Sequence, residues 1–139
     1  MSVTRPVPND HHAPGGQYSH IAIVPSGRLA FIAGQVAIDP AGNIVAPGDL
    51  TGQTSYVFRN LQNILDNLGV TSAEIAELRT FIVGEDSVPV FRQARKSAFD
   101  EMFPTGDYPP NTLLVVAGLA DPQFVIEISA VVALPAEHT

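Results

Sequence analysis

Apolar and polar residues follow two different periods along the chain, and these periods mark its elements. Two β-rich runs, Tyr18–Val24 and Leu29–Ile38, flank the sequence PSGR, which predicts a β-hairpin. From about Leu50 to Leu68, apolar side chains recur at helical spacing instead, and Gly69 is well placed to end this helix in the left-handed conformation. The first half of the chain is therefore predicted to form two strands and a helix.

The second half also alternates between strand and helix patterns. Thr71–Glu74 has the pattern of a capping box, and the sequence ELRTFIVG that follows alternates as a strand. A second helix fits Val88–Phe103, with Ser87 as its cap. Its predicted apolar stripe is Val90, Ala94, Ala98 and Met102. With two last strands around the sequence ADPQ, the order β-β-α-β-α-β-β predicts an α+β fold with both helices on one face of a mixed sheet.

The last two strands raise a question about burial. The strand Thr112–Ala120 is apolar on both faces, and because helices cover one face only, self-association is the simplest way to bury the other. In the sequence FVIEISAVVAL, Glu127 falls on that second face. A carboxylate between subunits needs hydrogen-bond donors or a wet cavity, whereas a glutamate on a solvated rim needs neither. The pattern leaves both interpretations open.

Composition and charge exclude several classes of protein. The 139 residues make a single domain, with an irregular N-terminal arm over residues 1–16. A net charge of −7 without any Lys or Arg run disfavours binding to nucleic acid. The absence of cysteine excludes disulfides and thiolate chemistry. No apolar stretch reaches the roughly 20 residues of a membrane span, and the N-terminus lacks the pattern of a secretory signal. A soluble, cytoplasmic protein without a membrane partner is expected.

Few motifs in the sequence suggest a reaction. His11 and His12 are adjacent in the arm, but a pair without a nearby carboxylate cluster rarely makes a specific metal site, so no metal is predicted. Ser26 has no identifiable His or Asp partner, and neither a GxSxG elbow nor a phosphate-binding loop is present. No cofactor is therefore predicted.

Three segments in order carry a resemblance over nearly the whole chain: GGQYSHIAIV, FIAGQVAID and YPPNTLLVVAGLADPQFVIEISAVVAL. They resemble the reactive-intermediate deaminase superfamily, Rid, also called YjgF or L-PSP endoribonuclease-like. The resemblance implies a chorismate-mutase-like α+β fold and a homotrimer that binds a small-molecule substrate in clefts at its subunit interfaces. It also implies hydrolysis of a reactive enamine or imine to a ketone and ammonia, without a cofactor.

The same resemblance suggests roles for individual residues. Tyr18 matches the cleft tyrosine of the family, and Gly34–Gln35 match a turn whose backbone lines the cleft, with Ala33 in place of the usual serine. Glu127 matches the glutamate that positions the attacking water in deaminating members, while Ser129 replaces a second glutamate. Glu127 and Tyr18 are thus the catalytic candidates, and the turn belongs to the substrate-binding set.

Asn111 departs from the family pattern, and Thr112 after it completes the substrate-binding set. Deaminating members have an arginine at this position that holds the substrate carboxylate in a bidentate fork, and asparagine has no charge to do so. Asn111 is otherwise an ordinary turn residue after two prolines. Arg92 or Arg95 on the second helix can compensate, although such residues usually belong to a solvated face.

Two functions follow from this set of residues. The first is hydrolysis of an enamine or imine other than the usual 2-imino acid, which Glu127 favours. The second is a non-catalytic, trimeric metabolite-binding protein, which Asn111 favours. The endoribonuclease role claimed for some relatives fits poorly with the acidic charge.

Overall fold

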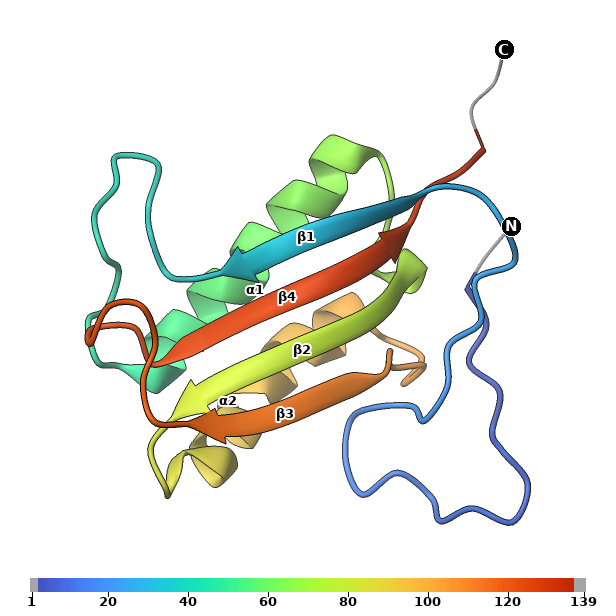
Figure 1. Ribbon diagram of the computed structural model, residues 1–139, viewed down its shortest axis with the longest axis horizontal. Coiled ribbons are helices and arrows are strands. Elements are labelled where there is room, and N and C mark those ends of the chain that lie inside the picture. The colour runs from blue at the N-terminus through green and yellow to red at the C-terminus, as the bar shows by residue number, and fades with distance from the viewer. Residues whose placement is uncertain (1–2, 137–139) are drawn as a thin grey trace.

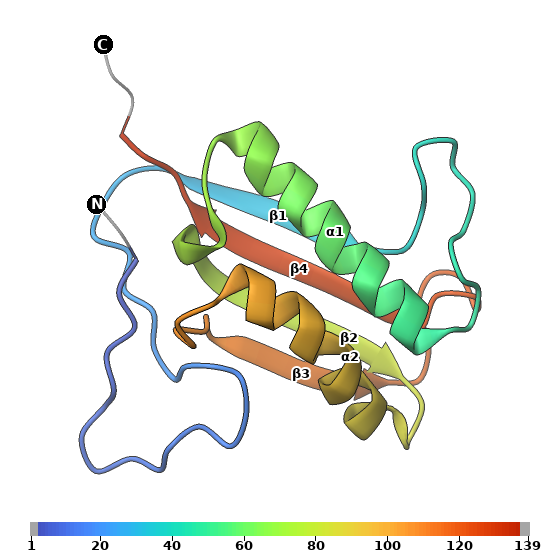
Figure 2. The same ribbon diagram turned by 180° about the vertical axis from the view of Figure 1, so that it is seen from behind.

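Four strands form one mixed sheet with the spatial order β1-β4-β2-β3 in the computed structural model, which describes residues 3–136. Its elements are β1 (Leu29–Gln35), α1 (Leu50–Leu68), a 3₁₀ turn (Ser72–Glu74), β2 (Ile75–Val83), α2 (Ser87–Met102), β3 (Asn111–Val116) and β4 (Ile126–Ala133). Both α-helices cover the same face of the sheet (Figure 2), and the opposite face is open (Figure 1). The layers confirm the predicted α+β fold.

The predicted hairpin is wrong, because Tyr18–Val24 is not a strand of the sheet. Its backbone groups have other partners: Ile23 exchanges two hydrogen bonds with Thr4, and the Ser19 N–H donates to the Pro109 carbonyl. Strand β1 pairs with β4 instead, and no other strand formed by residues 3–136 pairs with its outer edge. The observed order is therefore β-α-β-α-β-β.

Helix α1 has the predicted bounds, and Gly69 ends it with φ 71°. Its buried stripe also holds Gln53, which the apolar pattern did not indicate. The Gln53 amide donates to the carbonyls of Val45, Ala46 and Gln123 and accepts from the Val125 N–H. This fully bonded side chain ties the start of the helix to the segment that enters β4. Among residues 3–136, no helix has the length and apolar character of a membrane span.

Helix α2 turns a different face to the sheet from the predicted one. Its buried residues are Ser87, Phe91, Arg95 and Phe99, whereas Val90 is 44% exposed. The two phenylalanines are the largest apolar side chains of the helix, and burying them rotates the predicted stripe by one position. Arg95 stays in the buried stripe because its guanidinium lies over both rings, 5.1 Å and 5.2 Å from their centroids. The predicted cap at Ser87 is wrong, because Ser87 is the first residue of the helix and the N-cap is Asp86, whose side chain forms no capping hydrogen bond. The predicted capping box at Thr71 is not formed either, because the Thr71 side chain makes no capping hydrogen bond.

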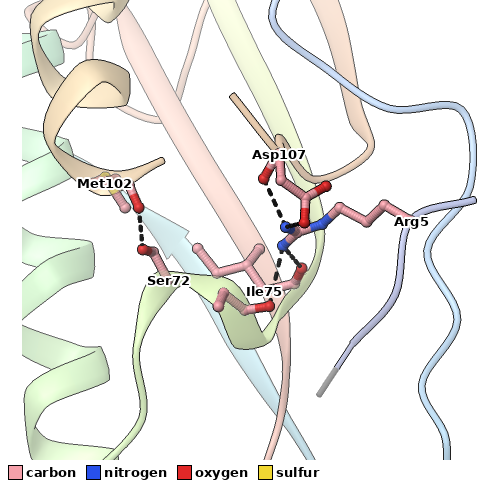
Figure 3. A network of polar contacts seen from close by, with 6 residues as sticks. Arg5, Ser72, Ile75, Met102 and Asp107 are labelled. Atoms are coloured by element: carbon pink, nitrogen blue, oxygen red, sulfur yellow. Dashed lines mark hydrogen bonds and ion pairs between the residues drawn. The ribbon is translucent and has the colours of Figure 1, made fainter. Parts of the chain in front are cut away.

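The N-terminal arm is irregular but held in place by Arg5, which sequence analysis did not single out. Figure 3 shows its guanidinium against the loop after α2, where it pairs with the Asp107 carboxylate at 3.3 Å. It also donates to the carbonyls of Asp107, Ala73 and Ile75. Burial lowers the pKa of Arg5, and Asp107 opposes that shift. The arm is therefore fixed at Arg5, and again where Ser19 meets Pro109.

Candidate functional site

Glu127 lies on the open face of the sheet, as the alternation in β4 predicts. Its neighbours in the strand, Ile126 and Ile128, are fully buried under the helices, and Glu127 is partly buried on the other side. It pairs with Phe81 of β2, which pairs in turn with Leu114 of β3. Residues paired across a sheet share a face, so the carboxylate stands in a row with two large apolar side chains.

A β-bulge at the end of β1 places Gly34 directly under this carboxylate. Ile32 pairs with Ala130 and Gln35 with Ile128, so three steps on β1 match two on β4. A Cβ atom at Gly34 would lie 2.0 Å from Glu127 Oε2, far inside van der Waals contact. The side chain of Gln35 donates to the Ala33 carbonyl at 3.0 Å and bridges the bulge. Bulges next to functional sites commonly direct a side chain in this way.

The carboxylate of Glu127 has no hydrogen bond or ion pair to any of residues 3–136. No lysine on an outer rim neutralises it within this part of the chain. An unpaired carboxylate on a partly apolar surface can accept a proton or hold a water molecule. The arrangement thus has the minimum that acid–base chemistry needs.

Asn111 does not share the face of Glu127. It pairs with Leu78, which the helices bury completely, and its side-chain oxygen accepts a hydrogen bond of 3.0 Å from the hydroxyl of buried Thr80. Along β2, the partners of Asn111 and Glu127 are three residues apart, which separates the two by about 10 Å along the strands. Thr112, the next residue, faces the open side. Within one chain, therefore, Asn111 and Glu127 do not form one site.

Tyr18 lies beside the start of β3, at the corner of the sheet diagonally opposite Gly34. The hydrogen bond from Ser19 to Pro109 holds it there, and the Tyr18 hydroxyl accepts from the Gly15 N–H at 3.3 Å. Strands β1 and β3 run in the same direction at opposite edges of the sheet (Figure 1), so the end of β1 and the start of β3 are far apart. The predicted site residues thus fall into two groups. The Glu127 group consists of Glu127 and the bulge residues Ala33, Gly34 and Gln35. The Tyr18 group consists of Tyr18 and the residues at the start of β3, Asn111 and Thr112.

The Tyr18 group includes a cation that sequence analysis placed on a solvated face. Arg95 is 5% exposed, and a Cβ at Gly16 would lie 3.8 Å from its Nη2. Its Nε is buried without a hydrogen-bond partner among residues 3–136, and no carboxylate in that range pairs with it. Burial lowers the pKa of Arg95, and the positive charge of Arg92 adds to that shift. A buried cation of this kind is a candidate for binding an anionic group.

Comparison with known proteins identifies the family. The model of the family described as Endoribonuclease L-PSP matches residues 9–134. A Rid-family protein of unknown function from Yersinia pestis, YyfB, is 30% identical, with a TM-score of 0.85 over 96% of this chain and 100% of that one. The chain belongs to the Rid (L-PSP) family. This confirms the resemblance seen in the sequence.

Other Rid-family relatives are more distant. A RutC family protein of Sulfurisphaera tokodaii is 28% identical over 85% of this chain and 88% of its own. Escherichia coli TdcF, whose structure contains bound serine, is 26% identical, with a TM-score of 0.67 over 81% of this chain and 85% of that one. Although the family is described as an endoribonuclease family, the net charge of −7 disfavours binding of RNA by this member.

The structure also gathers histidines in a way that sequence spacing did not show. His20 lies against His11 and His12, and one ring nitrogen from each of the three is within 4.8 Å of the others. The signal was hidden because His20 belongs to the segment predicted as a strand, which would have carried it away from the arm. This cluster is separate from the Glu127 group.

Gly34→Ala tests the close approach between the bulge and the carboxylate. The added methyl carbon would lie 2.0 Å from Glu127 Oε2, so we expect the carboxylate to be displaced and the free energy of unfolding to fall by about 1–3 kcal/mol. Gly118→Ala is the matched control, because a Cβ there meets nothing within 4 Å. Denaturant unfolding measures both variants. Glu127→Ala should recover the loss in the double variant, and equal stability of the two glycine variants would refute the contact.

Proposed function

We propose that this Rid-family protein hydrolyses a reactive enamine or imine to a ketone and ammonia, with a substrate other than the usual 2-imino acid. The observation that supports this most strongly is the unpaired Glu127 carboxylate lying on the Gly34 backbone at the bulge. The Rid family includes deaminating proteins with a glutamate at the matching position.

Hydrolysis of an imine requires the protein to position one water molecule and to transfer protons. In a protonated imine, or in the iminium ion that an enamine gives on protonation at carbon, the carbon bound to nitrogen is electrophilic, and water adds to it. The Glu127 carboxylate holds this water and takes one of its protons as the C–O bond forms, giving a carbinolamine. The same carboxyl then returns the proton to the nitrogen, and as the C–N bond breaks it takes the proton of the hydroxyl, which becomes the ketone oxygen. The leaving ammonia takes up this last proton and departs as ammonium. The atoms balance with one water consumed.

A cleft around Glu127 needs a second copy of the chain. The open face exposes large apolar side chains, including Phe31 at 77% and Leu114 at 42%. Such a surface on a small protein indicates an interface. We propose a homotrimer in which the Glu127 group of one subunit meets the Tyr18 group of its neighbour. This arrangement explains why the predicted site residues lie at opposite corners of one sheet.

The substrate charge depends on Arg95 in this proposal. Asn111 is neutral and already bonds Thr80, so it offers no charge to a carboxylate. Arg95, beside Gly16 and Tyr18, is the cation within the Tyr18 group. A substrate carboxylate would relieve its unfavourable burial, because ion pairing offsets desolvation. We therefore expect neutral imines to be good substrates, with any turnover of anionic ones depending on Arg95.

A metabolite-binding protein without catalysis is the second candidate. TdcF, a relative at 26% identity, has serine bound in its structure. Serine has no imine to hydrolyse, and binding of a small amino acid there shows that a related fold can hold such a ligand. The missing fork arginine at Asn111 favours this alternative.

Glu127→Gln separates the two candidates. The amide keeps the shape of the side chain and can hold a water, but it cannot accept a proton. We expect the trimer to persist and ammonia release from a panel of neutral imines and 2-aminoacrylate to fall roughly 100-fold or more. Ser129→Ala, on the same face and strand, is the control and should retain activity. Full activity in Glu127→Gln would refute the catalytic role, and an inactive wild type that still binds small ligands would favour the binding protein.

Arg95→Met tests the origin of any affinity for a carboxylate. Methionine keeps the apolar stem beside Phe91 and Phe99 while the charge is lost, so we expect stability to be unchanged or higher. For 2-iminopropionate, kcat/KM should fall by roughly 100-fold, whereas neutral imines should be unaffected. Arg92→Met is the matched control, since Arg92 is exposed on the same helix. An equal loss for neutral and anionic substrates would show that Arg95 does not recognise charge.

A further inference from the structure

Three imidazole rings meet at the N-terminal arm. The rings of His11 and His12 stack with centroids 4.7 Å apart, and the ring of His20 stands edge-on to both, at 4.4 Å and 4.7 Å. One nitrogen from each lies within 4.8 Å of the other two. We propose that His11, His12 and His20 bind a divalent transition metal ion of the zinc or copper class.

The hydrogen bonds of two rings leave lone pairs for a metal. His20 Nε2 lies 2.8 Å from the His12 carbonyl oxygen, and His12 Nδ1 lies 2.9 Å from the Ala13 carbonyl oxygen. A carbonyl can only accept, so these two nitrogens carry the protons. The opposite nitrogen of each ring, His20 Nδ1 and His12 Nε2, then has the lone pair that a metal requires. Histidine ligands in metal sites are oriented by such bonds at the second ring nitrogen.

The spacing requires only a small closure of the rings. Tetrahedral Zn²⁺ with Zn–N bonds of about 2.05 Å needs ring nitrogens about 3.4 Å apart, so nitrogens within 4.8 Å of one another would approach by at most about 1.4 Å. Rotation of exposed side chains supplies such a movement, and His11 and His12 are both exposed. Neutral imidazole suits zinc, copper and nickel, and three protein ligands leave a position for water. The net charge of −7 favours a bound cation.

Contacts within the chain hold the segments that carry the three histidines. The arm is held by Arg5 before the histidine pair and by the hydrogen bond from Ser19 to Pro109 just before His20. Asp10, with φ 56°, turns the chain immediately before His11. Much of the ordering entropy of the ligands is therefore lost on folding and not on metal binding. The ring of His20 also stands edge-on to that of Tyr18, with centroids 5.6 Å apart, so the site adjoins the Tyr18 group. The inference does not depend on the proposed hydrolysis, because none of the three histidines has a role in that reaction.

Calorimetric titration with Zn²⁺ tests the site in the full chain. The wild type should bind one ion per chain, and His11→Gln, His12→Gln and His20→Gln should each weaken binding by roughly tenfold or more. His138→Gln is the matched control, because it removes the fourth histidine of the sequence, which lies outside the described residues. It should leave the affinity unchanged.

Electron paramagnetic resonance of the Cu²⁺-loaded protein counts the nitrogen ligands independently of affinity. The wild type should show three imidazole nitrogens, and His20→Gln should show two. Circular dichroism checks that each variant is folded. Absence of binding, binding unaffected by His20→Gln, or an equal loss in His138→Gln would overturn the proposal.

Discussion

The Glu127 side chain fills the space where a Cβ atom of residue 34 would stand, and the geometry of the candidate site depends on this fit. Any side chain at Gly34 would take the place of the carboxylate oxygen. The bulge inserts one residue into β1 and thereby places this glycine next to Glu127. The carboxylate can therefore stand beside the apolar side chains of Phe81 and Leu114 because the neighbouring strand leaves room for it. The helices on the far face make the strand rigid, since Ile126 and Ile128 on either side of Glu127 are completely buried.

The same sheet separates the site into two parts. Its helix-covered face holds Asn111 and Thr80, its open face holds Glu127, and Tyr18 and Arg95 lie by the start of β3. One chain thus presents an acid–base group at one corner and a cation and an aromatic ring at the opposite corner. An assembly that joins unlike corners would build a complete cleft from two incomplete ones, and the exposed apolar side chains of the open face supply the driving force. Rotational symmetry would repeat this contact around a closed ring.

Regular periodicity made much of the fold predictable. Helix α1 and the alternation of β4 follow from apolar spacing alone, because each buries one continuous face. Tyr18–Val24 looked like a strand because composition shows β-propensity but not the pairing partner, which proved to be Thr4. Arg95 was predicted to face solvent because a charged side chain is normally excluded from a buried stripe. It is buried here because its guanidinium lies over the rings of Phe91 and Phe99. The bulge and the histidine cluster depend on register and chain path, which no local pattern encodes.

In the proposed trimer, Tyr18 of one subunit and the bulge of another line one cleft. The chain has no cysteine, so Tyr18→Cys/Ala33→Cys gives two unique thiols. Within one chain they lie at opposite edges of a four-stranded sheet, separated by about 14 Å across the strands alone. A bifunctional maleimide too short to span that width can then link them only between subunits. We expect covalent dimers and trimers on a denaturing gel, with single-cysteine variants giving no trimer. A product that stays monomeric would contradict a cleft shared between subunits.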